Sequence, residues 1–270
     1  DSAYSAVLSN QKQLDLEIKS GTTKQYPVLK STDRLEGDKV LPIELSALEK
    51  SLVDASDKYL LRAKPGDDKS PAIAYRAAEL FYTHNQFDEA RKRFKVIITT
   101  YPKAEVAKFA VNLIVESRLT DKNWAAVEQE AAELAANKDV IEPKSELYRQ
   151  LKKFELGGKF KLAEELMAKG QFDEAAKKYI ELVAAEPKHE FADKALNNAA
   201  VCFSKVKRFN EATKTYERIF KEYPQSDLAP AGEKPAPQVV ADDGHVRSVA
   251  LGEGPAARHA HASDGEIPWR

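Results

Sequence analysis

Two histidines near the C-terminus are the residues whose type and spacing come closest to metal chemistry. His259 and His261 form an HxH pair, and His245 and Asp264 lie nearby in the sequence. Imidazole nitrogens bind zinc, copper or nickel when a strand or loop holds both rings in place. This pair lies in a stretch rich in alanine and glycine that predicts no such support. The sequence therefore indicates no metal site and no cofactor.

Catalytic side chains are equally sparse in the rest of the chain. The single cysteine, Cys202, lies between two apolar residues, which favours a buried structural thiol over a reactive one. Acidic pairs such as Glu164-Glu165 and Asp173-Glu174 are more typical of a solvated helix face than of an acid and base. The sequence contains no phosphate-binding loop, zinc-binding helix or nucleophile elbow. We therefore expect a protein that is not an enzyme.

Composition excludes several further classes of protein. The 270 residues are 43% hydrophobic, which is enough to build a core. Basic and acidic residues number 42 and 43, so the net charge of -1 argues against a protein that binds nucleic acid by neutralising phosphates. No apolar run approaches the roughly 20 residues of a membrane-spanning helix. A single cysteine excludes an internal disulfide.

The elements that must position any binding residues are helices. Apolar residues recur at intervals of three and four, and the alternation of β-branched residues that indicates strands is absent. One apolar stripe predicts a helix within residues 43–63, and a second helix is expected within residues 6–18. Residues 20–38 are rich in glycine, threonine and charge, so they are interpreted as a connection.

The chain divides into three expected parts. Residues 1–42 form an N-terminal helix and its connection, residues 43–226 form the helical body, and residues 227–270 form a low-complexity tail rich in alanine, glycine and proline. Such a tail cannot bury enough apolar surface to offset its ordering entropy. Two explanations of the tail stay open, namely a linker toward a further part of a longer protein and a segment of different origin.

One motif occurs three times in the body. In each copy a turn residue is followed by an aromatic residue, an alanine three residues later, an aromatic four residues after that, and a proline eight residues further on. The copies are Asn85 to Pro102, Gly170 to Pro187 and Lys207 to Pro224. A fixed internal period of this kind predicts a repeat architecture.

Each part of the motif has a physical reason. The turn residue ends one helix, and the Asp or Asn after the first aromatic is expected to cap the next helix through its side chain. The alanine allows two helices to approach closely, and the proline ends the unit because it cannot continue a helix. The predicted caps are Asp88, Asp173 and Asn210, and the alanines are Ala90, Ala175 and Ala212. Each unit is therefore predicted to be an antiparallel helix pair.

These motifs resemble the tetratricopeptide repeat family, whose unit is a helix pair of about 34 residues. The resemblance covers residues 43–226, with a degenerate unit at 123–127 and an insertion near 138–157. It also includes the small first-helix residues Ala78, Ala163 and Ala200, whereas Ala74, Lys159 and Leu196 replace the family's tryptophan. The resemblance implies an all-α, right-handed α-α superhelix of antiparallel helix pairs, followed by a disordered or irregular C-terminal tail.

Within the family, the chain is similar to tetratricopeptide proteins of the Gram-negative cell envelope, including lipoproteins of the outer-membrane assembly and gliding-motility type. This resemblance implies a periplasmic or outer-membrane-associated location, while a cytoplasmic one stays open.

The resemblance also implies where a partner would bind, because the first helix of each pair lines the concave groove. The candidate partner-binding residues are Tyr75, Glu79, Tyr82, Phe160, Glu164, Asn197, Asn198 and Lys205, with Met167, Val201 and Ser204 beside them. Aromatic rings flanked by amides and charges suit an extended peptide or a helix. Some family members hold a peptide C-terminus with a basic clamp, and Lys161 and Lys205 could contribute to one here. The matching asparagines occur only in the last unit, so the type of ligand stays open.

We therefore expect a non-enzymatic scaffold that binds a partner protein or peptide, without nucleic acid and without a membrane-spanning segment. One alternative is a structural spacer within a longer repeat protein, whose groove is merely solvated. An enzyme that uses the histidine pair or the insertion is a more distant alternative. The last unit ends at Pro224 without a clear capping helix, which predicts further repeats in a longer chain or self-association through that end.

Overall fold

The computed structural model describes residues 2–33 and 40–228, and these ranges contain ten α-helices, one short 3-10 helix and no β-strand. The elements are α1 (Ser2–Ser20), η1 (Ser31–Asp33), α2 (Ala47–Leu60), α3 (Ser70–Thr83), α4 (Phe87–Thr100), α5 (Glu105–Thr120), α6 (Trp124–Ala136), α7 (Glu146–Ala168), α8 (Phe172–Ala185), α9 (Ala192–Lys205) and α10 (Phe209–Glu222). The all-α class is confirmed. Residues 229–270 of the predicted tail, including the histidine pair, lie outside the described residues. Within these ranges, no helix is long and apolar enough to cross a membrane.

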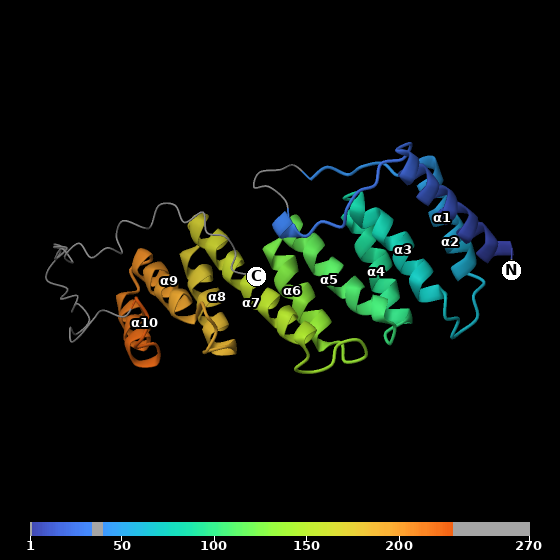
Figure 1. Cartoon of the computed structure of the whole chain (residues 1–270). Helices are drawn as coiled ribbons and strands as arrows, with labels where there is room; N and C mark the ends of the chain where they lie inside the picture. The colour runs from blue at the N-terminus through green and yellow to red at the C-terminus, as the bar shows by residue number, and fades with distance from the viewer. Residues whose placement is uncertain (1, 34–39, 229–270) are drawn as a thin grey trace, which may run out of the picture. The chain divides into compact units, whose positions relative to one another are not determined.

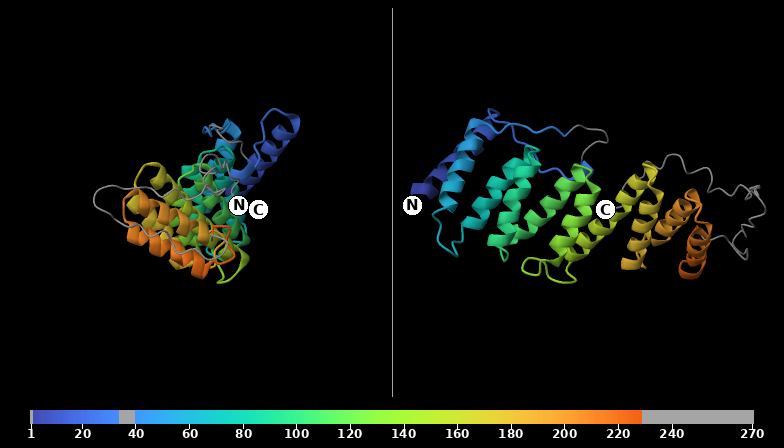
Figure 2. Two further views of the ribbon diagram at one scale, coloured as in Figure 1. Left: turned by 90° about the vertical axis from the view of Figure 1, so that its left-hand side faces the viewer. Right: turned by 180° about the vertical axis from the view of Figure 1, so that it is seen from behind.

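The helices are arranged as successive pairs (Figure 1). The pairs are α1–α2, α3–α4, α5–α6, α7–α8 and α9–α10, and each helix contacts the next one in the sequence. The same order is visible from behind (Figure 2). Contacts that are almost entirely between sequence neighbours define a solenoid. The predicted helix-pair architecture is therefore confirmed, and α1 supplies the first helix of the first pair.

The buried side chains form three successive clusters along the solenoid. The first joins α1, α2 and α3, the second extends from α3 to the start of α7, and the third extends from α7 to α10. Helix α7 belongs to two of them, because Leu151 packs in the second cluster and Leu156 in the third. The small residues Ala78, Ala163 and Ala200 are all fully buried, as the motif predicts.

A residue with left-handed backbone geometry separates the helices within four of the pairs. Their φ angles are 57° at Asn85, 51° at Lys122, 77° at Gly170 and 63° at Lys207. The amide that follows each of them donates to a carbonyl five residues earlier, which satisfies a free carbonyl at the helix end. The turn residue of the motif is thus the position where the chain reverses.

The predicted N-caps at Asp88, Asp173 and Asn210 are wrong. The residues that precede these helices are Gln86, Gln171 and Arg208, and none of them makes a side-chain cap hydrogen bond. The left-handed turn brings the aromatic residue itself to the first helical position, so the Asp or Asn already lies inside the first turn. A carboxylate there still interacts favourably with the positive end of the helix dipole. In the degenerate unit, by contrast, the Asn123 side chain does cap α6 by accepting from the amide of Ala126 at 3.1 Å.

The predicted insertion near 138–157 consists of an irregular connection and the first turns of α7. Residues 137–145 join α6 to α7, which is 23 residues long. Helix α7 then packs closely on α6 at Gly158. A Cβ atom added there would lie 2.8 Å from the backbone nitrogen of Glu128 and 3.1 Å from the carbonyl oxygen of Trp124.

The connection between α1 and α2 lies against other helices of the solenoid. From α1 it passes to η1, which contacts α5, and its last residues return beside the α3–α4 turn to reach α2 (Figure 1). We call residues 22–33 the outgoing arm and residues 40–46 the return arm. The return arm is fixed where the amide of Ile43 donates to the carbonyl of His84 at 2.8 Å and the Gln86 side chain donates to the carbonyl of Ile43 at 2.6 Å.

Candidate partner-binding site

Three glutamates occupy equivalent positions in successive first helices, eight residues before the aromatic residue that opens the second helix. They are Glu79 on α3, Glu116 on α5 and Glu164 on α7. Two of them are paired on their own helix, because Arg76 lies 2.7 Å from Glu79 and Lys161 lies 2.8 Å from Glu164. Glu116 has an apolar residue at the corresponding position and binds the outgoing arm instead.

Glu116 is a site residue that the sequence analysis missed. Its carboxylate oxygen Oε2 accepts hydrogen bonds from both the backbone nitrogen and the Oγ of Ser31, each at 2.9 Å. The spacing of eight residues before Trp124 was a signal that could have located it, because Glu79 and Glu164 have the same spacing from Phe87 and Phe172. The degenerate unit obscured this equivalence.

Tyr75 forms an aromatic patch with its neighbours on α4 and α5. Its ring centroid lies 5.7 Å from that of Phe94 and 6.3 Å from that of Phe109. Burial, together with the charge of Glu79, raises the pKa of Tyr75, so its hydroxyl stays neutral at physiological pH. Phe109 retains 48% of its exposure, and the patch is therefore accessible at its α5 side.

Tyr82 does not offer a surface to a partner. The residue is 1% exposed, and its hydroxyl donates to the carbonyl of Leu29 at 2.8 Å. Its ring packs near those of Phe87 and Phe94. The outgoing arm therefore lies where the sequence analysis placed a groove residue for a partner.

Two of the candidate residues, Phe160 on α7 and Asn198 on α9, contact the buried Tyr179 of α8. Phe160 packs with its ring centroid 5.4 Å from Tyr179 and 5.5 Å from Phe191, a half-buried residue just before α9. The Asn198 side chain donates to the hydroxyl of Tyr179 at 3.3 Å. Burial raises the pKa of Tyr179, so this hydroxyl stays protonated and accepts the bond.

The amide of Asn197 is the polar group best placed for a partner on α9. Its side chain is half-buried, and no hydrogen bond joins it to another of the described residues. Lys205 is exposed at the end of the same helix. Ser204 is already bonded to the carbonyl of Ala200, and Met167 packs against the third cluster. Asn197 and Lys205 are therefore the polar residues of the predicted set on α9 whose side chains are not engaged within the described residues.

The predicted site residues form two separate groups. Tyr75, Glu79 and Tyr82 lie on α3, which contacts α2, α4 and α5, whereas the others lie on α7 and α9, which both contact α8. We call the α7–α9 group the distal face; its residues are Phe160, Glu164, Asn197, Asn198 and Lys205. The α3 group is partly covered by the outgoing arm, and no hydrogen bond or ion pair joins the arm to the distal face within the described residues.

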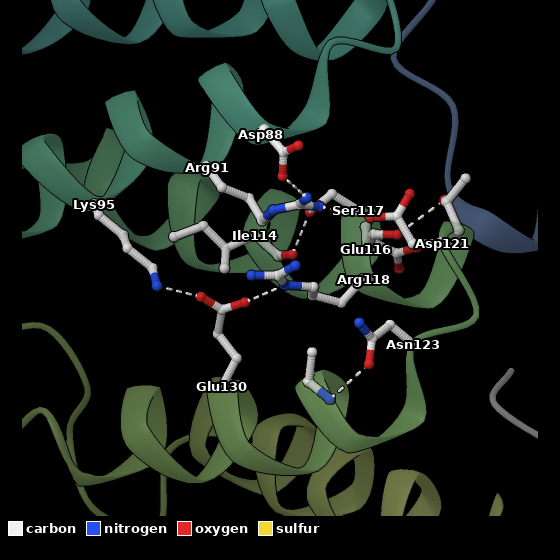
Figure 3. Close-up of polar contacts among 12 residues, drawn as sticks. Asp88, Arg91, Lys95, Ile114, Glu116, Ser117, Arg118, Asp121, Asn123 and Glu130 are labelled. Atoms are coloured by element: carbon white, nitrogen blue, oxygen red, sulfur yellow. Dashed lines mark hydrogen bonds and ion pairs between the residues drawn. The ribbon is translucent and has the colours of Figure 1, made fainter. Parts of the chain in front are cut away.

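A buried charge network ties α4, α5 and α6 together beside the outgoing arm (Figure 3). Arg91, which is 5% exposed, contacts Ser117 and Asp121, each at 2.9 Å. Glu130, which is also 5% exposed, accepts from Arg118 at 2.6 Å and forms an ion pair with Lys95. These residues are engaged with one another, so we interpret the network as structural.

Cys202 occupies the buried position that the sequence predicts. It is fully buried, and burial raises the pKa of its thiol to about 11, which disfavours the reactive thiolate. The described residues contain no group of three or more His, Cys, Asp or Glu side chains that could hold a metal ion. The HxH pair at His259 and His261 lies outside these residues.

The fold defines a repeat protein built of helix pairs, and comparison with known proteins agrees with this class. Residues 72–104 and 195–226 match the family model of the tetratricopeptide repeat. These two segments correspond to α3–α4 and α9–α10, so the family resemblance is confirmed for the first and last copies of the motif. No curated protein matches the sequence.

Two solved structures of a putative kinesin light chain from Podosopora anserina, with nearly identical TPR-like repeats, are also similar to this chain. One of them, a form with a single substitution, is 13% identical, with a TM-score of 0.29 and coverage of 66% of this chain and 88% of that one. The other is 12% identical, with a TM-score of 0.30 and coverage of 67% and 89%.

Proposed function

We propose that this chain is a non-enzymatic scaffold that binds an extended peptide of a partner protein on the distal face. The observation that carries the proposal is that the ring of Phe160 on α7 and the amide of Asn198 on α9 both contact Tyr179. Rings supply contact area at a low entropic cost, and amides can bond a peptide backbone in both directions. The tetratricopeptide matches support the same class of function.

The chemistry of the distal face favours a peptide with an apolar or aromatic anchor. Phe160 and Phe191 offer half-buried ring surface, and the half-buried Asn197 supplies a donor and an acceptor on α9. Lys205 adds an exposed positive charge at the end of α9 that would attract an acidic residue or a C-terminal carboxylate. The occupant that fits this face is therefore an extended peptide with an apolar anchor and a nearby negative group.

The proposal is tested with peptides selected from a random library on the full chain. We expect the double variant Asn197→Ala, Lys205→Ala to weaken binding of the selected peptides by about tenfold or more, which corresponds to about 1.4 kcal/mol. Fluorescence anisotropy measures the affinity. The matched control is Asn210→Ala, Lys214→Ala, which removes the same two residue types from exposed positions on α10.

If both double variants weaken binding equally, or if neither changes the affinity of the selected peptides, the distal face is not the binding site. Either result would favour the structural spacer. Circular dichroism must show unchanged helicity in each variant for the comparison to count.

We further propose that the scaffold belongs to a bacterial envelope assembly. The support is the resemblance of its repeats to envelope tetratricopeptide proteins. Fractionation of cells that express the tagged full-length protein tests the location, and a purely cytoplasmic distribution would overturn it.

A further inference from the structure

The α1–α2 connection is much longer than its task requires. Helices α1 and α2 pack against each other, yet residues 21–46 separate them. Neighbouring helices in bundles are usually joined by about 2 to 8 residues, and longer loops without helices or strands of their own are commonly functional. The excess length carries the outgoing arm past α3 to α5.

The outgoing arm is held the way a peptide ligand is held. The Tyr82 hydroxyl binds the carbonyl of Leu29 at 2.8 Å, and Glu116 binds both the amide and the hydroxyl of Ser31 at 2.9 Å. Two of these three bonds involve the backbone of the arm, so they depend on the course of the backbone more than on a particular sequence. We call Tyr82 and Glu116, with the surface between them, the proximal seat.

Glu116 needs a donor from outside its own helix. Glu79 and Glu164 are each paired with a basic residue on the same helix, whereas no ion pair of Glu116 occurs within the described residues. Its carboxylate instead accepts two bonds from Ser31, and bonds to a charged acceptor are stronger than those between neutral groups. A residue with both a free amide and a hydroxyl, such as Ser or Thr, satisfies this seat.

Little apolar burial holds the outgoing arm in place. Val28 is 43% exposed, and the neighbouring residues Pro27, Lys30 and Thr32 are also at least partly exposed. Tyr26 is half-buried, and its ring packs edge-on against that of His84 with the centroids 4.8 Å apart, so it is the main apolar contact of the outgoing arm. The return arm is fixed by backbone bonds of its own at His84 and Gln86. Release of the outgoing arm therefore breaks the bonds at the proximal seat and the contact between Tyr26 and His84, and it leaves the helix pairs closed.

We propose that the outgoing arm is an intramolecular ligand of the proximal seat, and that the seat binds in trans a peptide that presents a Ser or Thr to Glu116. A partner peptide of this chemistry competes with the arm. This proposal extends the proposed function, peptide binding by the scaffold, to a second site on different helices.

The probe is a fluorescein-labelled synthetic peptide with the sequence of residues 22–33, titrated into the full chain. The variant Ser31→Pro removes both donors to Glu116, and proline is tolerated because Ser31 is the first residue of η1. We expect this variant to bind the peptide at least tenfold more tightly than the wild type, because its own arm no longer fills the seat. Ser31→Thr keeps both donors and should bind like the wild type.

A second substitution assigns the binding to the proximal seat. Adding Glu116→Ala to Ser31→Pro should abolish the gain, and a peptide with proline at the position of Ser31 should not bind the Ser31→Pro chain. In the wild-type background, Glu116→Ala should accelerate hydrogen exchange of the Ser31 amide. A Ser31→Pro chain that binds no better than the wild type, or a gain that survives Glu116→Ala, overturns the proposal.

The distal-face variant separates the two proposals. Asn197→Ala, Lys205→Ala in the Ser31→Pro background should leave binding of the 22–33 peptide unchanged. Loss of that binding would place the peptide on the distal face and overturn the proximal seat. If the library peptides do not bind the distal face, the titration with the 22–33 peptide still tests the proximal seat.

Discussion

At the residue scale, the buried charges between α4, α5 and α6 make the stability of this part of the solenoid depend on pH. Burial by itself would raise the pKa of Glu130, but hydrogen bonds from Arg118 and Lys95 outweigh burial and lower the pKa below the ordinary value of 4.5. A carboxylate with a lowered pKa in the folded state stabilises the fold above its unfolded-state pKa. That contribution is lost as the pH falls from about 4.5 through the lower pKa of the folded state.

We predict that Glu130→Gln removes this pH-dependent contribution. At pH 7 the variant should lose about 1 to 3 kcal/mol of unfolding free energy, because Arg118 and Lys95 lose their anionic partner. The difference from the wild type should shrink as the pH falls below 4.5, where the wild-type carboxyl also becomes protonated. Urea unfolding at neutral and acidic pH measures both quantities.

The matched control is Glu133→Gln, which removes a carboxylate from the exposed face of α6. A Glu130→Gln deficit that stays constant across the acidic range would show that packing, not charge, accounts for the loss.

At the scale of elements, the close approach of α6 and α7 determines how the middle of the solenoid packs. Gly158 lies in the interior of α7, where glycine is normally unfavourable by about 1 kcal/mol relative to alanine. Its presence is explained by the backbone of α6, because a Cβ atom would approach Glu128 and Trp124 within 3.1 Å. The contact is with backbone atoms, which cannot move aside as a flexible side chain would.

We predict that Gly158→Ala destabilises the protein by about 1 to 3 kcal/mol, although alanine is the better helix former. The overlap with the backbone of α6 forces the two helices apart. Thermal and urea unfolding measure the change, and Gln150→Ala on the exposed face of α7 serves as the control with little expected effect. A stabilised Gly158→Ala variant would mean that α6 and α7 separate at little energetic cost.

At the scale of the whole described chain, the helices differ in how many other elements they pack against, and α3 and α5 pack against more of them than α10 does. The outgoing arm joins the N-terminal part to α3 and α5 through Tyr82 and Glu116. Helix α10, by contrast, contacts chiefly α9 in the described residues. Side chains also bond across this end, because the Tyr223 hydroxyl donates to the carbonyl of Pro187 at 2.6 Å and Arg208 pairs with Asp173 at 2.9 Å. The stability of a solenoid is approximately a sum of contacts between neighbouring helices, so a helix that packs chiefly on one neighbour should open first.

We predict that amides in α9 and α10 exchange with solvent faster than those in α3 and α5. Native-state hydrogen exchange read by mass spectrometry measures the difference. Uniform protection from α3 to α10 would contradict the uneven distribution of contacts and indicate one cooperative unit. The self-association expected at the C-terminal end stays a prediction, and its occurrence would also protect α10.

The repeat motif predicted buried positions correctly and helix starts incorrectly. The alanines Ala90, Ala175 and Ala212 are buried as predicted, because their spacing repeats in three copies and small residues are needed where helices cross. The caps at Asp88 and Asp173 were wrong because a shift of two residues in the helix start depends on backbone geometry at the turn.

The sequence by itself determined the helix pairs and the turns between them. Periodicity, turn residues and prolines act over a few residues and recur in each copy, so they are visible without a structure. Only the tertiary structure decided that Tyr82 is covered and that Glu116 binds Ser31. Ser31 and Glu116 are 85 positions apart in the sequence. A contact between a non-repeated segment and the repeats leaves no period in the sequence.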